Sequence, residues 1–276
     1  MFFSPKIGMR FIYSLPVFIL FASIAGLYYC YLYGFLLVLP VESVIASAII
    51  FHTLLVLLIW SYIMSLMTDP GTPPKEFQSS QEDLPQENLN TEDVKTAKIT
   101  QCKVCNTIRP PRTHHCQHCD RCVLRRDHHC PWVANCVGFY NHRFFIQFLS
   151  YTTLTSTVLT FSCLSTMEIN GWGYNIQSLV GFIVGLLIVL GLGGFTIFHY
   201  YLLCINSTST EFKPGYHFNV FNTTSCKSNC SQVLGKNIIG YILPIRTSFG
   251  VDPVSYPVRI RNNLGEILNY KNKIPI

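Results

Sequence analysis

Apolar residues are concentrated in four long stretches of the chain, and polar segments separate them. The stretches cover residues 11–39, 44–67, 144–167 and 179–204, and none contains Lys, Arg, Asp or Glu. Each is long enough for an α-helix to cross the hydrocarbon core of a bilayer, which needs about 20 residues. The first stretch continues well beyond the cleavage-site-like Ser23-Ile24-Ala25, which favours a spanning helix over a signal peptide. The pattern therefore predicts a polytopic membrane protein with four transmembrane helices.

The distribution of charge agrees with this architecture and orients it. Only 12% of the residues are charged, whereas 49% are apolar, and soluble domains carry about twice that share of charge. Two Lys or Arg residues precede the first stretch, ten lie between the second and third, and eight follow the fourth. The loops 40–43 and 168–178 carry none. The positive-inside rule therefore predicts that both termini are cytosolic, and the net charge of +6 does not indicate nucleic-acid binding.

Polar segments divide the chain into five parts. Residues 1–71 hold the N-terminus and the first two helices, and Asp69-Pro70-Gly71 ends the second helix. Residues 72–100 form a polar linker with too few apolar residues to fold alone. Residues 101–143 are rich in Cys and His, 144–206 hold the last two helices, and 207–276 form a cytosolic tail. The predicted fold class is an all-α polytopic membrane protein with a cytosolic module between helices 2 and 3.

Residues 102–145 hold seven of the twelve cysteines and six of the nine histidines. Pairs of Cys-x-x-Cys, followed at a distance by further Cys and His residues, are typical ligands of tetrahedral zinc. Two closed zinc sites need eight donors, so some of these groups are spare. If both sites use three Cys and one His, one spare group is a thiol. A spare thiol beside spare imidazoles is a candidate nucleophile.

The remaining cysteines are not expected to form disulfides. A zinc site needs reduced thiols, and therefore indicates a reducing, cytosolic environment. Cys30, Cys163 and Cys204 lie within or at the ends of apolar stretches and are expected to pack as small apolar residues. For Cys226 and Cys230 in the tail, ordinary residues are favoured over additional acylation sites.

The Cys–His region resembles the DHHC-type protein S-acyltransferases, membrane enzymes that attach palmitate to cysteines. The resemblance rests on Asp127-His128-His129-Cys130 within the complete Cys–His spacing, and on Pro131-Trp132-Val133 and Asn135-Cys136-Val137-Gly138. Thr208-Ser209-Thr210-Glu211 matches a further family element, with Ser in place of the second Thr. The resemblance implies two structural Zn²⁺ ions. The expected ligands are Cys102, Cys105, His115 and Cys122 for the first, and Cys116, Cys119, His129 and Cys136 for the second.

The resemblance also implies the catalytic groups. Cys130 is expected to accept the acyl group of palmitoyl-CoA, with His128 as its base and Asp127 orienting that base. A free thiol has a pKa near 8.5, so a neighbouring base must help to form the thiolate. The CoA head would lie in the cytosol, and its candidate contacts are Arg109, Arg112, Arg125 and Arg126. The alternative for these arginines is a surface that faces solvent or lipid headgroups.

The expected partners are acyl-CoA, the lipid bilayer and membrane-associated proteins with cytosolic cysteines, but no nucleic acid. The segment Ser255-Tyr256-Pro257-Val258-Arg259 looks most like the broad-specificity subgroup of the plasma membrane and Golgi. The resemblance thus implies the Golgi, endoplasmic reticulum or plasma membrane as the compartment.

Other classes of protein fit the sequence less well. A membrane-tethered zinc scaffold would need the eight ligands but not Asp127, His128 or Cys130. A channel or transporter usually carries charged residues in its spans, and these spans have none. A nucleic-acid-binding zinc protein would need a C2H2 finger pattern, which is missing. A transferase that works only with a partner subunit stays open as an alternative.

Overall fold

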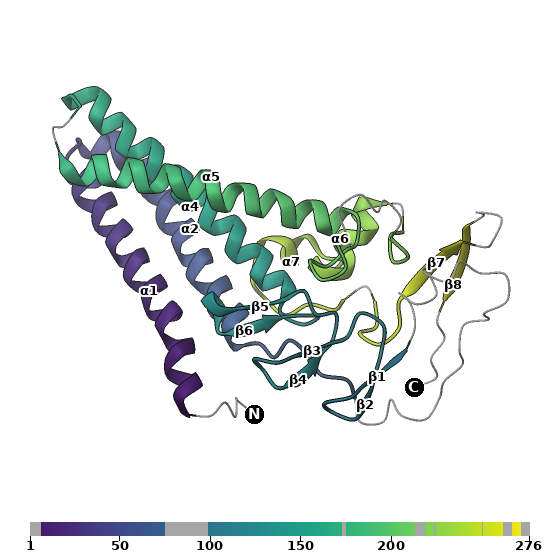
Figure 1. Cartoon of the computed structure of the whole chain (residues 1–276). Coiled ribbons are helices and arrows are strands. Elements are labelled where there is room, and N and C mark those ends of the chain that lie inside the picture. The colour runs from purple at the N-terminus through teal and green to yellow at the C-terminus, as the bar shows by residue number, and fades with distance from the viewer. Residues whose placement is uncertain are drawn as a thin grey trace.

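The computed structural model describes residues 7–74, 99–172, 175–212, 219–223, 225–249, 251–261 and 267–271. Within these ranges, four long helices form a bundle: α1 (Ile7–Tyr31), continued by the π-helix η1 (Leu32–Leu36), α2 (Val41–Met67), α4 (His142–Asn170) and α5 (Ile176–Cys204). A module of small hairpins and the tail elements lie at the end of the bundle where α2 ends and α4 begins (Figure 1). Most of the predicted linker lies outside the described residues.

Three of the four helices are long and apolar enough to cross a membrane. They cover Leu15–Leu36, Val41–Met67 and Ile176–Cys204, in agreement with the first, second and fourth predicted spans. The helix α4 has sufficient length, but its many Thr and Ser residues make it less apolar. It packs against both α2 and α5 inside the bundle.

Local sequence signals set the helix ends. Asn175 caps α5, because its side chain accepts hydrogen bonds from the backbone N–H groups of Gln177 and Ser178. At the end of α2, Gly71 has a φ of +100°, a conformation that a glycine adopts without strain. The Asp69 side chain accepts a hydrogen bond from the Gly71 N–H at 2.7 Å. The helix α2 ends at Met67, just before this segment, as predicted from Asp69-Pro70-Gly71.

Small residues let α5 approach α4 closely. A Cβ atom added to Gly181 would lie 2.7 Å from Cys163 Sγ, and one added to Gly185 would lie 2.5 Å from Thr160 Oγ1. Close packing of this kind is common between helices in lipid. The absence of a side chain at Gly181 and Gly185 therefore permits the close contact between α5 and α4.

Three short antiparallel hairpins build the Cys–His module. They pair β1 (Thr100–Cys102) with β2 (Thr107–Arg109), β3 (His114–Cys116) with β4 (Arg121–Val123), and β5 (His128–Cys130) with β6 (Asn135–Val137). The 3-10 helix η2 (Pro131–Val133) lies in the last connection. An isolated two-stranded hairpin is at most marginally stable in water. The module therefore needs support from bound ions or from the bundle.

Hydrogen bonds to backbone carbonyl groups fix this module to the end of α2. The Leu124 N–H donates to the Gly71 carbonyl at 3.0 Å. The Asn135 side-chain amide donates to the Thr68 carbonyl at 3.0 Å, and that of Asn141 donates to the Ser65 carbonyl at 3.2 Å. These bonds hold the last hairpin against the membrane helices.

The tail contributes α6 (Cys226–Leu234), α7 (Ile238–Ile242) and a hairpin of β7 (Pro257–Arg261) and β8 (Ile267–Lys271). A disulfide joins Cys204, at the end of α5, to Cys226, at the start of α6. The prediction that the chain has no disulfide is therefore wrong. The disulfide joins two residues that are 22 positions apart in sequence.

Candidate active site

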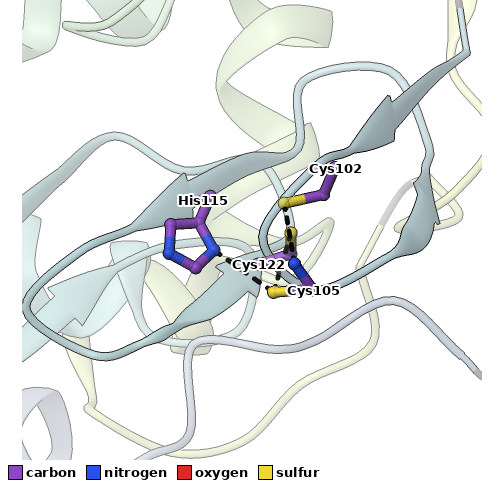
Figure 2. Close-up of side chains that lie close together, drawn as sticks. All are labelled: Cys102, Cys105, His115 and Cys122. Carbon is purple, nitrogen blue, oxygen red and sulfur yellow. Dashed lines mark hydrogen bonds between the residues drawn. The ribbon is translucent and has the colours of Figure 1, made fainter.

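The four donors predicted for the first zinc ion come together between two hairpins (Figure 2). Cys102 and Cys105 come from the first hairpin, and His115 and Cys122 lie opposite each other on β3 and β4. Cys105 Sγ is 3.2 Å from His115 Nδ1 and 3.8 Å from Cys122 Sγ. A tetrahedral site with Zn–S bonds of about 2.3 Å has edges of about 3.8 Å. The donors therefore fit a zinc ion.

The donors predicted for the second ion also form one cluster, with all ligand atoms within 4.8 Å of one another. His129 Nδ1 lies 3.4 Å from Cys119 Sγ and 3.7 Å from both Cys116 Sγ and Cys136 Sγ. Hydrogen bonds among the thiols lower the pKa of Cys116 and raise the pKa of Cys136. Without a cation, adjacent sulfurs cannot all ionise. A bound dication would allow them to do so.

Cys130 belongs to none of the metal-capable clusters found among the described residues. It is the last residue of β5 and is buried, with 7% of its surface exposed. It lies in an apolar cluster to which α2 contributes Tyr62, α4 contributes Phe145 and α5 contributes Leu203. The spare thiol that the donor count predicted is therefore placed at the end of the bundle, among apolar side chains.

His128 links this thiol to Asp127. The His128 ring donates from Nδ1 to Asp127 Oδ2 at 2.7 Å. Burial lowers the pKa of His128, but hydrogen bonds to Asp127 and to Cys130 outweigh burial and raise this pKa to about 9. Burial raises the pKa of Asp127, but the bond from His128 and the nearby His142 hold it well below its usual range. The imidazole is thus a strong base beside a thiol.

Residues that sequence reasoning did not assign to the site surround Asp127. The Ser209 N–H donates to Asp127 Oδ1 at 2.9 Å, and the Ser209 hydroxyl donates to Oδ2 at 2.8 Å. His142 Nε2 lies 4.0 Å from Asp127 Oδ1, and the His199 ring centre lies 6.0 Å from that of His128. The match at Thr208–Glu211 gave a signal for Ser209, whereas His199 stands without a motif in an apolar stretch.

The four candidate arginines fall into two groups. Arg112 and Arg125 are buried, with 4% and 2% exposure. Arg112 forms a two-pronged ion pair with Glu211, at 2.8 Å for each bond, and Arg125 donates to His142 Nδ1 at 2.9 Å. Both therefore use their guanidinium groups to join protein segments. Arg109 and Arg126 are only partly buried.

Two Cys3His sets, a thiol outside both and a carboxylate-oriented imidazole beside that thiol therefore lie together in a chain with three helices that could cross a membrane. A family model described as DHHC palmitoyltransferase matches residues 95–214. The chain is 31% identical over 263 residues to Probable protein S-acyltransferase 13 of Arabidopsis thaliana, with 87% of each chain covered. It is 32% identical over 290 residues to Palmitoyltransferase ZDHHC15 of Rattus norvegicus, with 90% of this chain and 82% of the relative covered. The chain therefore belongs to the DHHC palmitoyltransferase family and is a protein S-acyltransferase.

Proposed function

We propose that Cys130 carries the acyl group while the enzyme transfers it from palmitoyl-CoA or a similar acyl-CoA to cysteines of membrane-associated proteins. This proposal rests on two hydrogen bonds of His128, one to Asp127 and one to Cys130. Cys130 is also the thiol of the Cys–His module that lies outside both Cys3His sets.

The reaction needs two thioester exchanges. His128 takes the Cys130 proton, and the thiolate attacks the carbonyl carbon of acyl-CoA. The bond from that carbon to the CoA sulfur breaks, and the CoA thiolate takes the proton from His128. A substrate cysteine then repeats the exchange at the Cys130 thioester, with His128 again moving the proton. One thioester replaces another, so each step is close to balanced in free energy. Asp127 keeps the imidazole in the tautomer that faces the thiol.

The surroundings of Cys130 suit a long acyl chain. The apolar cluster continues from Cys130 into the bundle through Phe145, Phe148 and Leu58. Burial of each CH₂ group is worth about 0.8 kcal/mol. Trp132, half-exposed beside the nucleophile, is held by the Tyr62 hydroxyl, which donates to its carbonyl at 3.0 Å. We expect Trp132 to limit the access of water, which would hydrolyse the thioester.

The CoA head would remain in the aqueous phase, where cations can meet its phosphates. Arg109 and Arg126 are the candidates that the structure leaves partly exposed. Arg112 and Arg125 are no longer candidates for binding the CoA phosphates, because their guanidinium groups are buried against protein partners.

Two structural Zn²⁺ ions complete the enzyme. We assign the first to Cys102, Cys105, His115 and Cys122, and the second to Cys116, Cys119, His129 and Cys136. Because protein donors fill all four positions of each site, these ions would stabilise the hairpins and would not activate water. His129 adjoins His128 in sequence, so the second site also fixes the position of the base.

We further propose that α4 is the fourth span and that both termini are cytosolic. Hydroxyl groups of α4 face its partners, since Thr153 bonds Thr196 of α5 and Ser162 bonds Ser47 of α2. Leu154 and Phe161 remain 48% and 65% exposed. The polar side chains of α4 therefore face the inside of the bundle, and apolar side chains remain on its outer face. The proposed division at residues 71, 100, 143 and 206 follows from this topology.

A glycosylation sequence inserted between α4 and α5 tests the topology, with the native Asn222-Thr223-Thr224 in the tail as an internal control. The inserted sequence should be glycosylated and the native one should not. The reverse pattern would invert the topology. Imaging of the tagged full-length protein would then distinguish the Golgi, endoplasmic reticulum and plasma membrane.

The transfer itself can be tested in two stages. Purified protein in detergent is charged with labelled palmitoyl-CoA, separated from CoA, and given a peptide that contains one cysteine. Label should move from the protein to the peptide for the wild type and should be lost in Cys130→Ser. A peptide that Cys130→Ser labels at the wild-type rate would contradict the acyl-enzyme route. If the wild type is charged but cannot pass on the label, an accessory subunit becomes necessary.

A further inference from the structure

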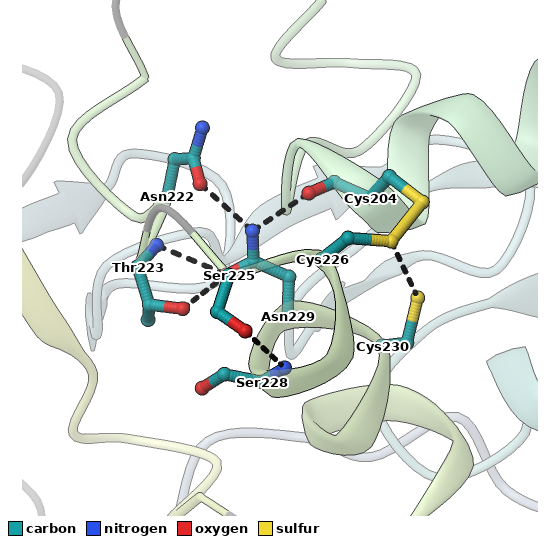
Figure 3. The surroundings of a disulfide bond; sticks show 8 residues. All are labelled: Cys204, Asn222, Thr223, Ser225, Cys226, Ser228, Asn229 and Cys230. Carbon is teal, nitrogen blue, oxygen red and sulfur yellow. Dashed lines mark hydrogen bonds between the residues drawn. A yellow bond between two sulfur atoms is a disulfide. The ribbon is translucent and has the colours of Figure 1, made fainter.

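Three cysteines outside the DHHC site meet where the tail returns to the bundle (Figure 3). Cys204 ends α5, and Cys226 and Cys230 lie one helical turn apart on α6. Their sulfur atoms lie within 4.8 Å of one another. Cys204 and Cys226 form the disulfide, and Cys230 Sγ lies 3.8 Å from Cys226 Sγ. A disulfide thus has a third thiol in contact with one of its sulfurs.

We propose that Cys204, Cys226 and Cys230 form a thiol–disulfide exchange site whose redox partner is the glutathione couple. The Cys230 thiolate attacks Cys226 Sγ, so that a Cys226–Cys230 bond forms and the Cys204–Cys226 bond breaks. The electron pair leaves on Cys204 Sγ, which takes up the proton that Cys230 released. This exchange keeps the number of disulfides constant and needs no oxidant. When all three residues are thiols, glutathione disulfide oxidises two of them to the first protein disulfide and is itself reduced to two glutathione molecules.

The location of the site supports exchange over a permanent crosslink. In the topology proposed above, the tail shares a compartment with the zinc ligands, which must be reduced. Disulfides that face the cytosol are usually transient or redox-sensing. Cys226 is exposed, and Cys204 and Cys230 are only partly buried, so a small thiol can reach the site.

The two possible disulfides differ in what they connect. The Cys204–Cys226 bond joins α5 to α6, whereas a Cys226–Cys230 bond would lie within α6 alone. The helix α6 is also held by Asn229, whose side chain donates to the Cys204 carbonyl at 2.7 Å. Its last residues, Val233 and Leu234, pack in the apolar cluster that contains Cys130. The Cys204–Cys226 bond therefore fixes α6, which packs near the nucleophile, to α5. Exchange to the Cys226–Cys230 bond releases α6 from α5 and leaves the catalytic groups unaltered.

The test maps disulfides in the full-length protein in mild detergent, equilibrated in glutathione buffers, quenched with acid and alkylated. Lys227 lies between Cys226 and Cys230, so trypsin separates these residues unless a disulfide joins their peptides. Mass spectrometry should find both linkages in the oxidised wild type. Only Cys204–Cys226 should remain in Cys230→Ser, and only Cys226–Cys230 in Cys204→Ser. Cys163→Ser, which removes a buried thiol of α4, is the matched control and should resemble the wild type.

Two results would overturn the proposal. Detection of the Cys204–Cys226 linkage alone in the wild type, in every oxidising buffer, would identify a static crosslink. Alkylation of all three thiols in every buffer, with a third zinc per chain that Cys230→Ser removes, would identify a metal site instead. Peptide mapping requires no acyl transfer. Its outcome is therefore separate from that of the charging experiment with Cys130.

Discussion

The substitution Asp127→Asn isolates the part of the mechanism that depends on one carboxylate. Asp127 accepts hydrogen bonds from His128 Nδ1 at 2.7 Å, from the Ser209 N–H at 2.9 Å and from the Ser209 hydroxyl at 2.8 Å. An asparagine of the same shape offers one oxygen and one NH₂ group to these donors. Its NH₂ group must therefore face a donor, or His128 must change its tautomer and direct a proton at Cys130.

The expected loss follows from these bonds. A hydrogen bond to a charged group contributes about 1.5–3 kcal/mol. In enzymes with an acid–imidazole–nucleophile arrangement, the wrong tautomer lowers turnover by up to about 10⁴-fold. We therefore expect acylation of Cys130 to slow by about 10²- to 10⁴-fold, equivalent to about 3–5 kcal/mol. The pKa of His128 should fall toward its ordinary value, because the bond to Asp127 raises it.

A single-turnover assay measures this loss. Enzyme in excess over labelled palmitoyl-CoA is quenched at short times, and the label on the protein is counted. Asp69→Asn is the matched control, because Asp69 bonds Gly71 and Arg121 but is remote from the thiol in the hydrogen-bond network. We expect loss of the exposed Asp69–Arg121 ion pair to change the free energy of unfolding by less than about 1 kcal/mol. If Asp127→Asn acylates within about fivefold of the wild type and keeps both zinc ions, Asp127 does not orient the base.

Three further substitutions test the supports of the site. Glu211→Gln leaves the buried Arg112 without its charged partner and should lower the free energy of unfolding by about 3–5 kcal/mol; an unchanged denaturant midpoint would argue against this ion pair. Gly185→Val would overlap Thr160 and should lower the same free energy by about 1–3 kcal/mol, whereas wild-type stability would mean that α4 and α5 do not approach this closely. Cys136→Ser should reduce the zinc content from two to one per chain in elemental analysis and abolish acylation; retention of both ions would remove Cys136 from the ligands.

The predictions that succeeded rest on local patterns. Three spans were found because length and apolarity are properties of a continuous stretch. The two Cys3His sets were expected from the family spacing, and the structure groups the same eight donors. The predicted span at residues 144–167 coincides with α4, but α4 is not among the three helices that are apolar enough to cross a membrane. Residues such as Thr153 and Ser162 are polar in sequence but bond to neighbouring helices.

The contacts that were missed all join distant segments. Ser209 reaches Asp127 across 82 residues, and Arg112 reaches Glu211 across 99. No periodicity in the loops around Arg112 distinguishes this buried cation from the partly exposed Arg109. The Cys204–Cys226 disulfide depends in the same way on the return of the tail to α5. Such pairings become visible only when the path of the chain is known.

The central claim is that Cys130 is a nucleophile and not a zinc ligand. The most direct measurement is the hydroxylamine-sensitive label on purified protein after incubation with labelled palmitoyl-CoA, read beside the zinc content. We predict label on the wild type and none on Cys130→Ser, with two zinc ions in both. Equal label on the two proteins, or loss of zinc from Cys130→Ser, would contradict the claim.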